Sequence, residues 1–210
     1  MMQQLPLAIS PRPEPAFDNF VPGPNAEALA RVRELAAGTL GERIVYLWGD
    51  AGSGRSHLLG AAARANPGLV VADDVQRLAP AEQRALFVAI NEAREGGPAV
   101  LAAGDRPPAQ LLLRADLKSR LAWGLVYQLL PLSDADKARH LKALAGARGL
   151  LLSDDVVAYL LARLPRDMAS LQAVMEVLDR YSLMRQRALT LPLVREALAQ
   201  EMLGGQVGGR

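Results

Sequence analysis

A glycine-rich stretch in the first third of the chain has the residue types and spacing of a phosphate-binding loop. It follows the apolar run 44–48 and precedes the helix-like run 57–63. Strand, glycine-rich turn and helix together let backbone N–H groups and a helix N-terminus bind a polyphosphate. The alternative is a plain tight turn, and the flanking runs favour the phosphate loop. The predicted nucleotide-binding residues are Gly49, Asp50, Ala51, Gly52, Ser53, Gly54, Arg55 and Ser56.

Arg55 stands where such loops usually carry lysine. Arginine keeps the positive charge, but its guanidinium is a rigid planar fork, whereas the lysine ammonium is a compact point charge. The loop therefore predicts nucleotide binding without predicting fast hydrolysis.

Two acidic residues, Asp73 and Asp74, close a second apolar run at 69–72. This is a Walker B pattern, in which an aspartate at the end of a neighbouring strand holds magnesium. The alternative is a helix cap or a turn. We predict Ser56 and Asp73 as magnesium ligands, and Asp74 as a residue that orients water.

A third apolar run, 99–103, is followed by a polar residue that can sense a terminal phosphate. Asp105 occupies this position. A carboxylate repels an anion, so Asp105 would have to act through water or through Arg106.

Strand-like and helix-like runs alternate up to Pro131 and then give way to four helical patterns. Asn25 is expected to cap a helix that ends near Ala37, and a further helix is expected over 111–121. The alternation predicts an α/β fold with a parallel sheet covered by helices, followed by a small all-helical domain. The expected parts are a flexible arm (1–15), a nucleotide-binding core (16–131), a helical lid (132–202) and a flexible tail (203–210).

Composition excludes several kinds of site. The 210 residues include no cysteine and two histidines, so thiolate metal sites are excluded and a histidine-rich one is not expected. A net charge of +2 does not by itself indicate nucleic-acid binding. The sequence has no membrane-length apolar run and no secretory signal, so we expect a cytoplasmic protein.

Several motifs, in the right order over about residues 17–200, resemble those of the replication initiator DnaA within the AAA+ family of P-loop ATPases. The resemblance implies a AAA+ core followed by a helical lid. The matching segments are Phe17–Val21, Ser56–Leu59, Asp73–Gln76, Gly104–Pro108, Leu117–Leu121 and Trp123–Gly124.

The chain also departs from the initiator. It ends after the lid pattern, so the initiator's helix-turn-helix DNA-binding domain is not expected. Only residues 57–72 separate Ser56 from Asp73, where the wider family places another strand and helix, which leaves four strands. The chain has an arginine in the P-loop and a short N-terminal arm. In both features it resembles the Hda family of DnaA regulatory inactivators.

The resemblance implies roles for further residues. Arg120 matches an arginine finger that acts in trans, and Arg166 matches the sensor 2 arginine of the lid. The alternative for both is a surface arginine. Gln4, Leu5 and Leu7 match a motif that binds the sliding clamp. A shifted register ending in Leu5-Pro6-Leu7 fits equally well, and the two leucines could instead fold back on the core. Trp48 and Trp123 are expected to be packing residues.

The resemblance therefore implies a negative regulator of DNA replication initiation, rather than an efficient ATPase. It would bind ADP (or ATP) with Mg²⁺. With the DNA-loaded sliding clamp (the beta subunit), it would stimulate hydrolysis of DnaA-bound ATP through Arg120. The expected partners are DnaA and the clamp, with DNA contacted through the clamp, nucleoid association by that route and no membrane. Homo-oligomerisation stays open. The alternatives are a stand-alone ATPase of initiator or loader type and a nucleotide-independent adaptor between clamp and initiator.

Overall fold

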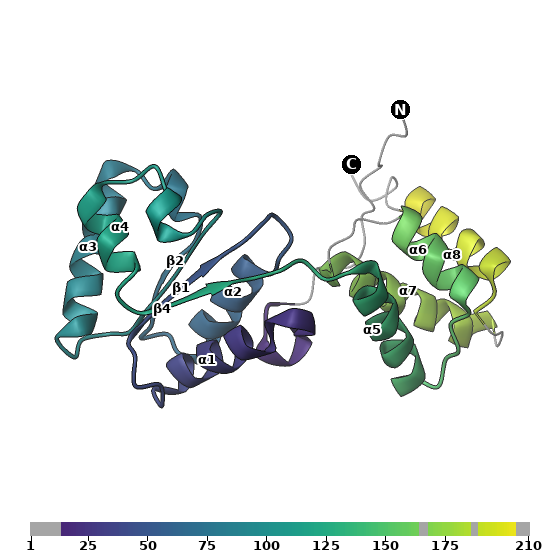
Figure 1. The fold of residues 1–210 in the computed structure, drawn as a ribbon. Helices are drawn as coiled ribbons and strands as arrows, with labels where there is room; N and C mark the ends of the chain where they lie inside the picture. The colour runs from purple at the N-terminus through teal and green to yellow at the C-terminus, as the bar shows by residue number, and fades with distance from the viewer. Residues whose placement is uncertain (1–13, 164–167, 186–188, 205–210) are drawn as a thin grey trace. The chain divides into compact units, whose positions relative to one another are not determined.

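The computed structural model describes residues 14–163, 168–185 and 189–204 (Figure 1). Two compact units divide this part of the chain. One is Pro15–Pro131, and the other contains the residues from Leu132 onward.

The first unit is built on a four-stranded sheet in which every pair of neighbouring strands is parallel. The strand order β2-β3-β1-β4 puts β2 and β4 at the two edges. The predicted parallel sheet with four strands is confirmed. The strands are β1 (Ile44–Trp48), β2 (Val70–Ala72), β3 (Val100–Gly104) and β4 (Leu125–Gln128).

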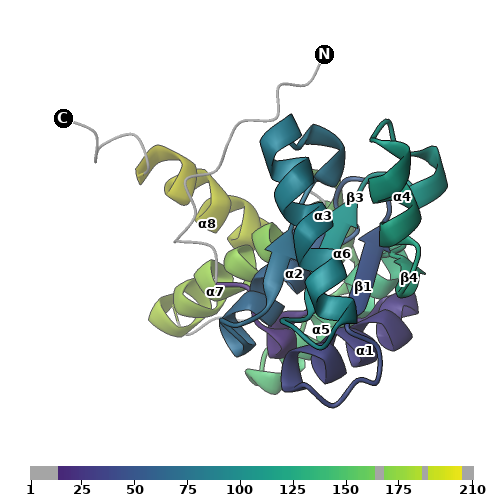
Figure 2. The same cartoon turned by 90° about the vertical axis from the view of Figure 1, so that its left-hand side faces the viewer.

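Helices cover both faces of this sheet. Figure 1 shows the sheet between two helix pairs, and Figure 2 views the unit from the α3 and α4 side. Side chains alternate along β1, so Val45 and Leu47 enter the α1/α2 layer whereas Ile44 and Tyr46 enter the α3/α4 layer. The four helices are α1 (Ala26–Ala37), α2 (Arg55–Ala65), α3 (Pro80–Arg94) and α4 (Ala115–Leu121).

The common direction of the strands separates the connecting segments into two groups. The segments that follow β1, β2 and β3 leave from the carboxyl edge of the sheet, where ligands bind in open α/β sheets. Arg43 precedes β1 and Gly124 precedes β4, so both lie at the amino edge.

Asn25 precedes α1, but its side chain does not cap the helix, contrary to our expectation. Its amide instead donates to the Leu130 carbonyl oxygen and accepts from the Leu130 N–H, each at 2.8 Å. The side chain is 4% exposed, so these two bonds satisfy polar groups that water does not reach. Asn25 therefore joins the start of α1 to the segment after β4.

The helix expected over 111–121 is shorter in the structure, because α4 begins at Ala115. Leu111 and Arg114 have extended backbone angles. The extended segment lets Leu111 enter the α3/α4 core, whereas Leu112 is 97% exposed. Burial of one leucine thus overrides the helical pattern of the sequence.

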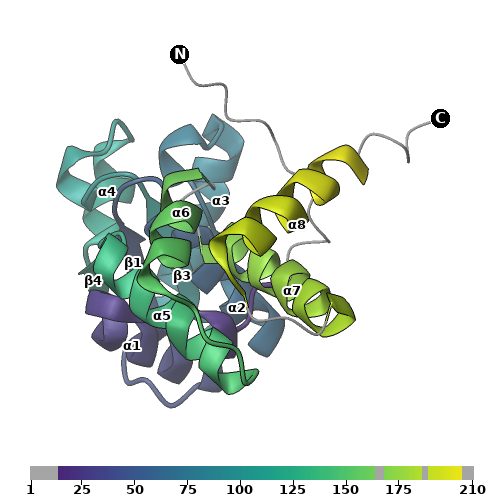
Figure 3. The same cartoon turned by 90° about the vertical axis from the view of Figure 1, so that its right-hand side faces the viewer.

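In the part of the second unit that the structure describes, four helices pack into a bundle, which can be followed in Figure 3. In it, α5 contacts α6 and α7, and α8 contacts the same two helices. The Ser133 hydroxyl caps α5 by accepting the Asp136 N–H. The described helices all fall short of the length and apolarity that crossing a bilayer requires. The bundle comprises α5 (Asp134–Ala147), α6 (Asp154–Arg163), α7 (Met168–Arg185) and α8 (Leu191–Gly204).

Tyr46 is a buried phenol in the middle of β1. It is fully buried and donates a hydrogen bond to the Arg106 carbonyl oxygen at 2.8 Å. Burial raises the pKa of Tyr46 most, the Asp105 carboxylate raises it further, and the Arg55 charge opposes both. The bond ties the core to the segment that follows β3.

We expect Asn25→Ala to lower the free energy of unfolding by about 2–4 kcal/mol, because it leaves both polar groups of Leu130 without a partner. Urea unfolding measures the change. The exposed control Gln110→Ala should stay within about 0.5 kcal/mol of the native protein. Equal stability of the two variants would contradict the role of Asn25.

We expect the free energy of unfolding to fall as pH rises above the ordinary tyrosine pKa of 10.0. The unfolded phenol then releases a proton that the native phenol still holds, so the stabilisation is complete at lower pH and is lost as pH rises. Urea unfolding at pH 9 and pH 11 should show a smaller loss for Tyr46→Phe than for the native protein. Equal losses would contradict the assignment.

Candidate nucleotide-binding site

The predicted phosphate loop connects β1 to α2 at the carboxyl edge of the sheet. Gly54 precedes α2 with φ +97°, and a Cβ atom there would lie 2.7 Å from the Phe20 ring. Glycine is therefore needed both for its backbone angle and for the close approach of Phe20. The Phe20 ring also lies against His57, whose Nε2 is 3.0 Å from the Ala16 carbonyl oxygen. His57 thus has a structural contact beside the loop.

Two buried polar atoms of the loop have no hydrogen-bond partner. They are the Ser53 hydroxyl oxygen and the Arg55 Nη1 atom. The Arg55 side chain is 12% exposed, and buried polar atoms in folded proteins are nearly always paired. A phosphate oxygen would satisfy both groups. The loop thus fits an anionic ligand in its chemistry as well as in its spacing.

The charge of Arg55 faces the acidic end of β2. Its Nη2 atom lies 3.9 Å from Asp74 Oδ1, the same oxygen that accepts from Gln76 Nε2 at 3.0 Å. Asp74 has φ +45°, a left-handed backbone angle that is uncommon outside glycine, and Arg77 lies 3.4 Å from its other oxygen. The Asp74 carboxylate therefore has three polar neighbours. Its role in orienting water stays a prediction.

Gln76 joins two predicted site residues and was missing from our candidates. Its Oε1 atom accepts the Asp105 N–H at 3.2 Å, while its Nε2 atom donates to Asp74. The segment after β2 is thereby coupled to the segment after β3. The only sequence signal was the place of Gln76 within the Asp73–Gln76 motif. Asp105 itself is exposed.

Ser56 and Asp73 are the residues that could hold magnesium. Ser56 is exposed in the first turn of α2, and Asp73 follows β2 directly. One Asp73 oxygen accepts the Asp74 N–H at 2.8 Å. Within the described ranges, no three histidine or acidic side chains gather into a metal cluster. Magnesium commonly takes one or two protein ligands together with phosphates and water, and this pair fits that pattern.

Arg120 lies near the amino edge of the sheet, whereas the phosphate loop lies at the carboxyl edge. Trp123, whose ring is 4.8 Å from the Arg120 guanidinium, precedes Gly124. A Cβ atom at Gly124 would collide with the Ile44 carbonyl oxygen, which marks the start of β1. The five residues of β1 span about 13 Å at about 3.3 Å per residue. The structure therefore brings the loop, Asp73, Asp74 and Asp105 together, and keeps Arg120 apart from them.

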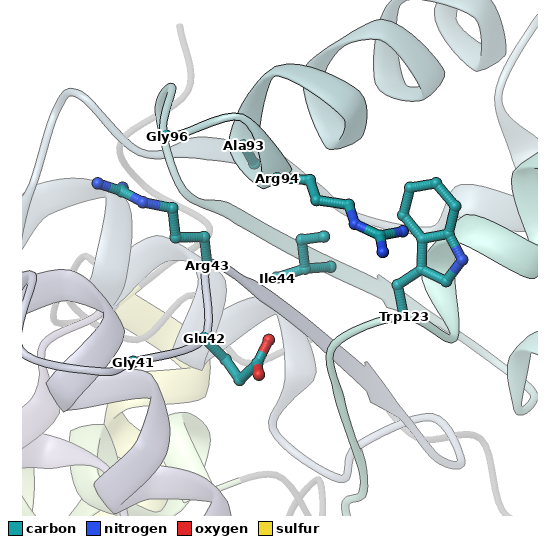
Figure 4. Close-up of a pocket in the computed structure, with 8 residues that line it drawn as sticks. All are labelled: Gly41, Glu42, Arg43, Ile44, Ala93, Arg94, Gly96 and Trp123. Atoms are coloured by element: carbon teal, nitrogen blue, oxygen red, sulfur yellow. The ribbon is translucent and has the colours of Figure 1, made fainter.

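A cavity of about 530 Å³ also lies at the amino edge (Figure 4). Its lining includes Arg43, Arg94 and Trp123. The Arg94 guanidinium carbon lies 4.3 Å from the centre of the Trp123 ring. Figure 4 shows the two side chains next to each other. Trp48 packs against the α3/α4 core, but Trp123 is 39% exposed and packs against charged side chains.

Four predicted site residues, Gln4, Leu5, Leu7 and Arg166, lie outside the described residues.

Comparison with known proteins adds two findings. A family model for the Hda lid domain matches residues 134–198, which run from the start of α5 into α8. Solved structures share the fold at low identity. Domain III of the Thermotoga maritima replication initiation protein DnaA has a TM-score of 0.66 at 21% identity, covering 92% of this chain and 99% of that one.

Two further structures support the same fold. AMPPCP-bound DnaA from Aquifex aeolicus has a TM-score of 0.61 at 22% identity, covering 78% of this chain and 64% of that one. A mutant RuvB from Thermotoga maritima has a TM-score of 0.61 at 14% identity, covering 90% and 72%. The predicted fold, a parallel sheet covered by helices and followed by a small helical unit, is confirmed. The Hda lid model therefore matches the second unit, and the solved structures show that the chain shares the fold of DnaA domain III.

Proposed function

We propose that this protein is a negative regulator of DNA replication initiation. With the DNA-loaded sliding clamp, it stimulates hydrolysis of ATP bound to DnaA through an arginine finger supplied in trans. The observation that carries the proposal is the position of Arg120 near the end of α4, on the amino-edge side of the sheet and away from the protein's own phosphate loop.

Nucleotide binding by the loop is the first part of the proposal. Two buried, unpaired polar atoms, in Ser53 and Arg55, support it, as does the AMPPCP bound to the DnaA relative. In this proposal Arg55 pairs with phosphate oxygens, the helix N-terminus donates N–H groups, and Ser56 and Asp73 hold Mg²⁺. ADP is the expected resident nucleotide, with Arg166 of the lid contacting it.

Action in trans is the second part. An arginine about one strand length from its own nucleotide cannot reach that nucleotide. Arg120 is only half-buried, so its guanidinium can reach a nucleotide bound to a neighbouring protein. A guanidinium beside a transferring phosphoryl group stabilises the charge of the transition state and accelerates hydrolysis by about 10³–10⁵-fold. Arg120 would complete the ATP site of DnaA in this way. Magnesium bound with the DnaA nucleotide would offset the same charge.

Recruitment is the third part. Gln4, Leu5 and Leu7 would dock on the sliding clamp, so that DNA is contacted through the clamp. Binding to a DNA-loaded clamp would limit the reaction to the period after replication has begun.

We expect Arg55→Ala to weaken ADP binding about 10–100-fold, because it removes charge-assisted hydrogen bonds to phosphate. Arg55→Lys keeps the charge and should stay within about threefold of the native protein. Calorimetric titration measures the affinity, with Arg84→Ala on the exposed surface of α3 as the control. Unchanged binding by a folded Arg55→Ala variant would favour the nucleotide-independent adaptor.

We expect Arg120→Ala to slow hydrolysis of DnaA-bound ATP by about 10³-fold or more while ADP binding persists. The measurement is single-turnover release of phosphate from DnaA preloaded with ATP, with this protein and clamp loaded on DNA. Omitting the clamp should also suppress the rate.

Two outcomes would contradict the regulator. One is no stimulation by the native protein when the clamp is shown to be bound. The other is ATP turnover by the isolated chain that Asp73→Asn abolishes, which would support the stand-alone ATPase.

A further inference from the structure

Arg120 is held in an alternating stack of arginines and aromatic rings on the α3/α4 side of the first unit. Its guanidinium carbon lies 4.0 Å from the centre of the Phe87 ring and 4.8 Å from that of the Trp123 ring. The guanidinium carbon of Arg94 lies 4.3 Å from the centre of the Trp123 ring, and that of Arg114 lies 5.9 Å from the centre of the Phe87 ring. Guanidinium groups at such distances are attracted by the electron-rich ring faces.

The third contact of Arg120 is a hydrogen bond from its Nε atom to Asn91 Oδ1, at 2.7 Å. Phe87 and Asn91 are four residues apart on α3, so one face of that helix presents both contacts. With two rings beside the guanidinium and Nε bonded, the two terminal nitrogens remain as donors. These are the atoms with which arginine binds two phosphate oxygens at once.

The partner of Nε is a neutral amide rather than a carboxylate. Within the described ranges no carboxylate oxygen lies within 4.0 Å of an Arg120 nitrogen, and the charge of Asp116 acts on Arg120 only from a greater distance. Neighbouring Arg114, by contrast, is paired with Asp116 at 2.5 Å. Asn91 can therefore fix the direction of Arg120 without cancelling its charge, which a finger for an anionic transition state requires.

We propose that Asn91, Phe87 and Trp123 are positioning residues for Arg120, an inference that rests on the function proposed above. The rings restrict the plane of the guanidinium, and the amide sets its rotation within that plane. The side chain is thereby ordered before DnaA binds. The free-energy cost of fixing it is therefore not added to the activation barrier of hydrolysis.

Substitutions at Asn91 test the proposal. Hydrolysis of DnaA-bound ATP is measured over a range of concentrations of this protein, which gives the maximal rate and the half-saturating concentration separately. Asn91→Leu should lower the maximal rate about 10²-fold, the order expected when a catalytic group is misplaced, with the half-saturating concentration within about threefold. Asn91→Asp should lower the rate further, toward that of Arg120→Ala, because a carboxylate would pair with the guanidinium. The control Glu92→Ala, on an exposed neighbouring position of α3, should keep the native rate.

Substitutions at Phe87 add a second test, in which an aromatic replacement should restore the rate that an aliphatic one lowers. Phe87→Leu should lower the maximal rate, and Phe87→Tyr should restore it, since a phenol ring keeps the stacking face. Native ADP affinity, measured at the far edge of the sheet, shows that each variant is folded. If a folded Asn91→Leu variant keeps the native maximal rate while Arg120→Ala loses it, the positioning role is wrong and the finger stands. If Arg120→Ala itself keeps the native rate, both proposals are wrong.

Discussion

The common direction of the four strands is the constraint on which the candidate sites depend. Parallel pairing gathers the segments after β1, β2 and β3 at one edge, and it sends the segments before β1 and β4 to the other. A group that binds nucleotide and a group that acts on a neighbour's nucleotide can then belong to one small unit. Reversing a single strand would move its loop to the wrong edge.

Within the carboxyl edge, a short chain of polar contacts links the loops. Arg55 faces Asp74, Asp74 accepts from Gln76, and Gln76 accepts the Asp105 N–H. A phosphate that draws Arg55 toward itself would compete with Asp74 for the same positive charge. This chain of contacts joins the phosphate loop to the segment after β3 through one ion pair and two hydrogen bonds.

The sequence predicted the sheet and its covering helices because buried strands leave continuous apolar runs and glycines mark the turns. It predicted the loop because phosphate binding restricts residue types at fixed spacing. It did not predict Gln76 or Asn91, each of which has a hydrogen-bond partner 29 residues away. Asn25 was wrong as a cap because a contact 105 residues away competes for the same amide. Hydrogen bonds between residues that are far apart in the sequence form only when the chain folds, so they leave no local sequence pattern.

The position of β2 at a sheet edge has a consequence for solubility. An edge strand exposes unpaired backbone donors and acceptors to which another chain can add, and long, flat, apolar edges promote aggregation. Here β2 has only three residues, Val70–Ala72, and a left-handed residue, Asp74, turns the chain away shortly after it ends. The acidic pair that follows adds negative charge beside this edge. The strand that precedes the predicted magnesium ligand Asp73 is thus very short and is followed at once by charged side chains, which disfavours pairing with a foreign strand.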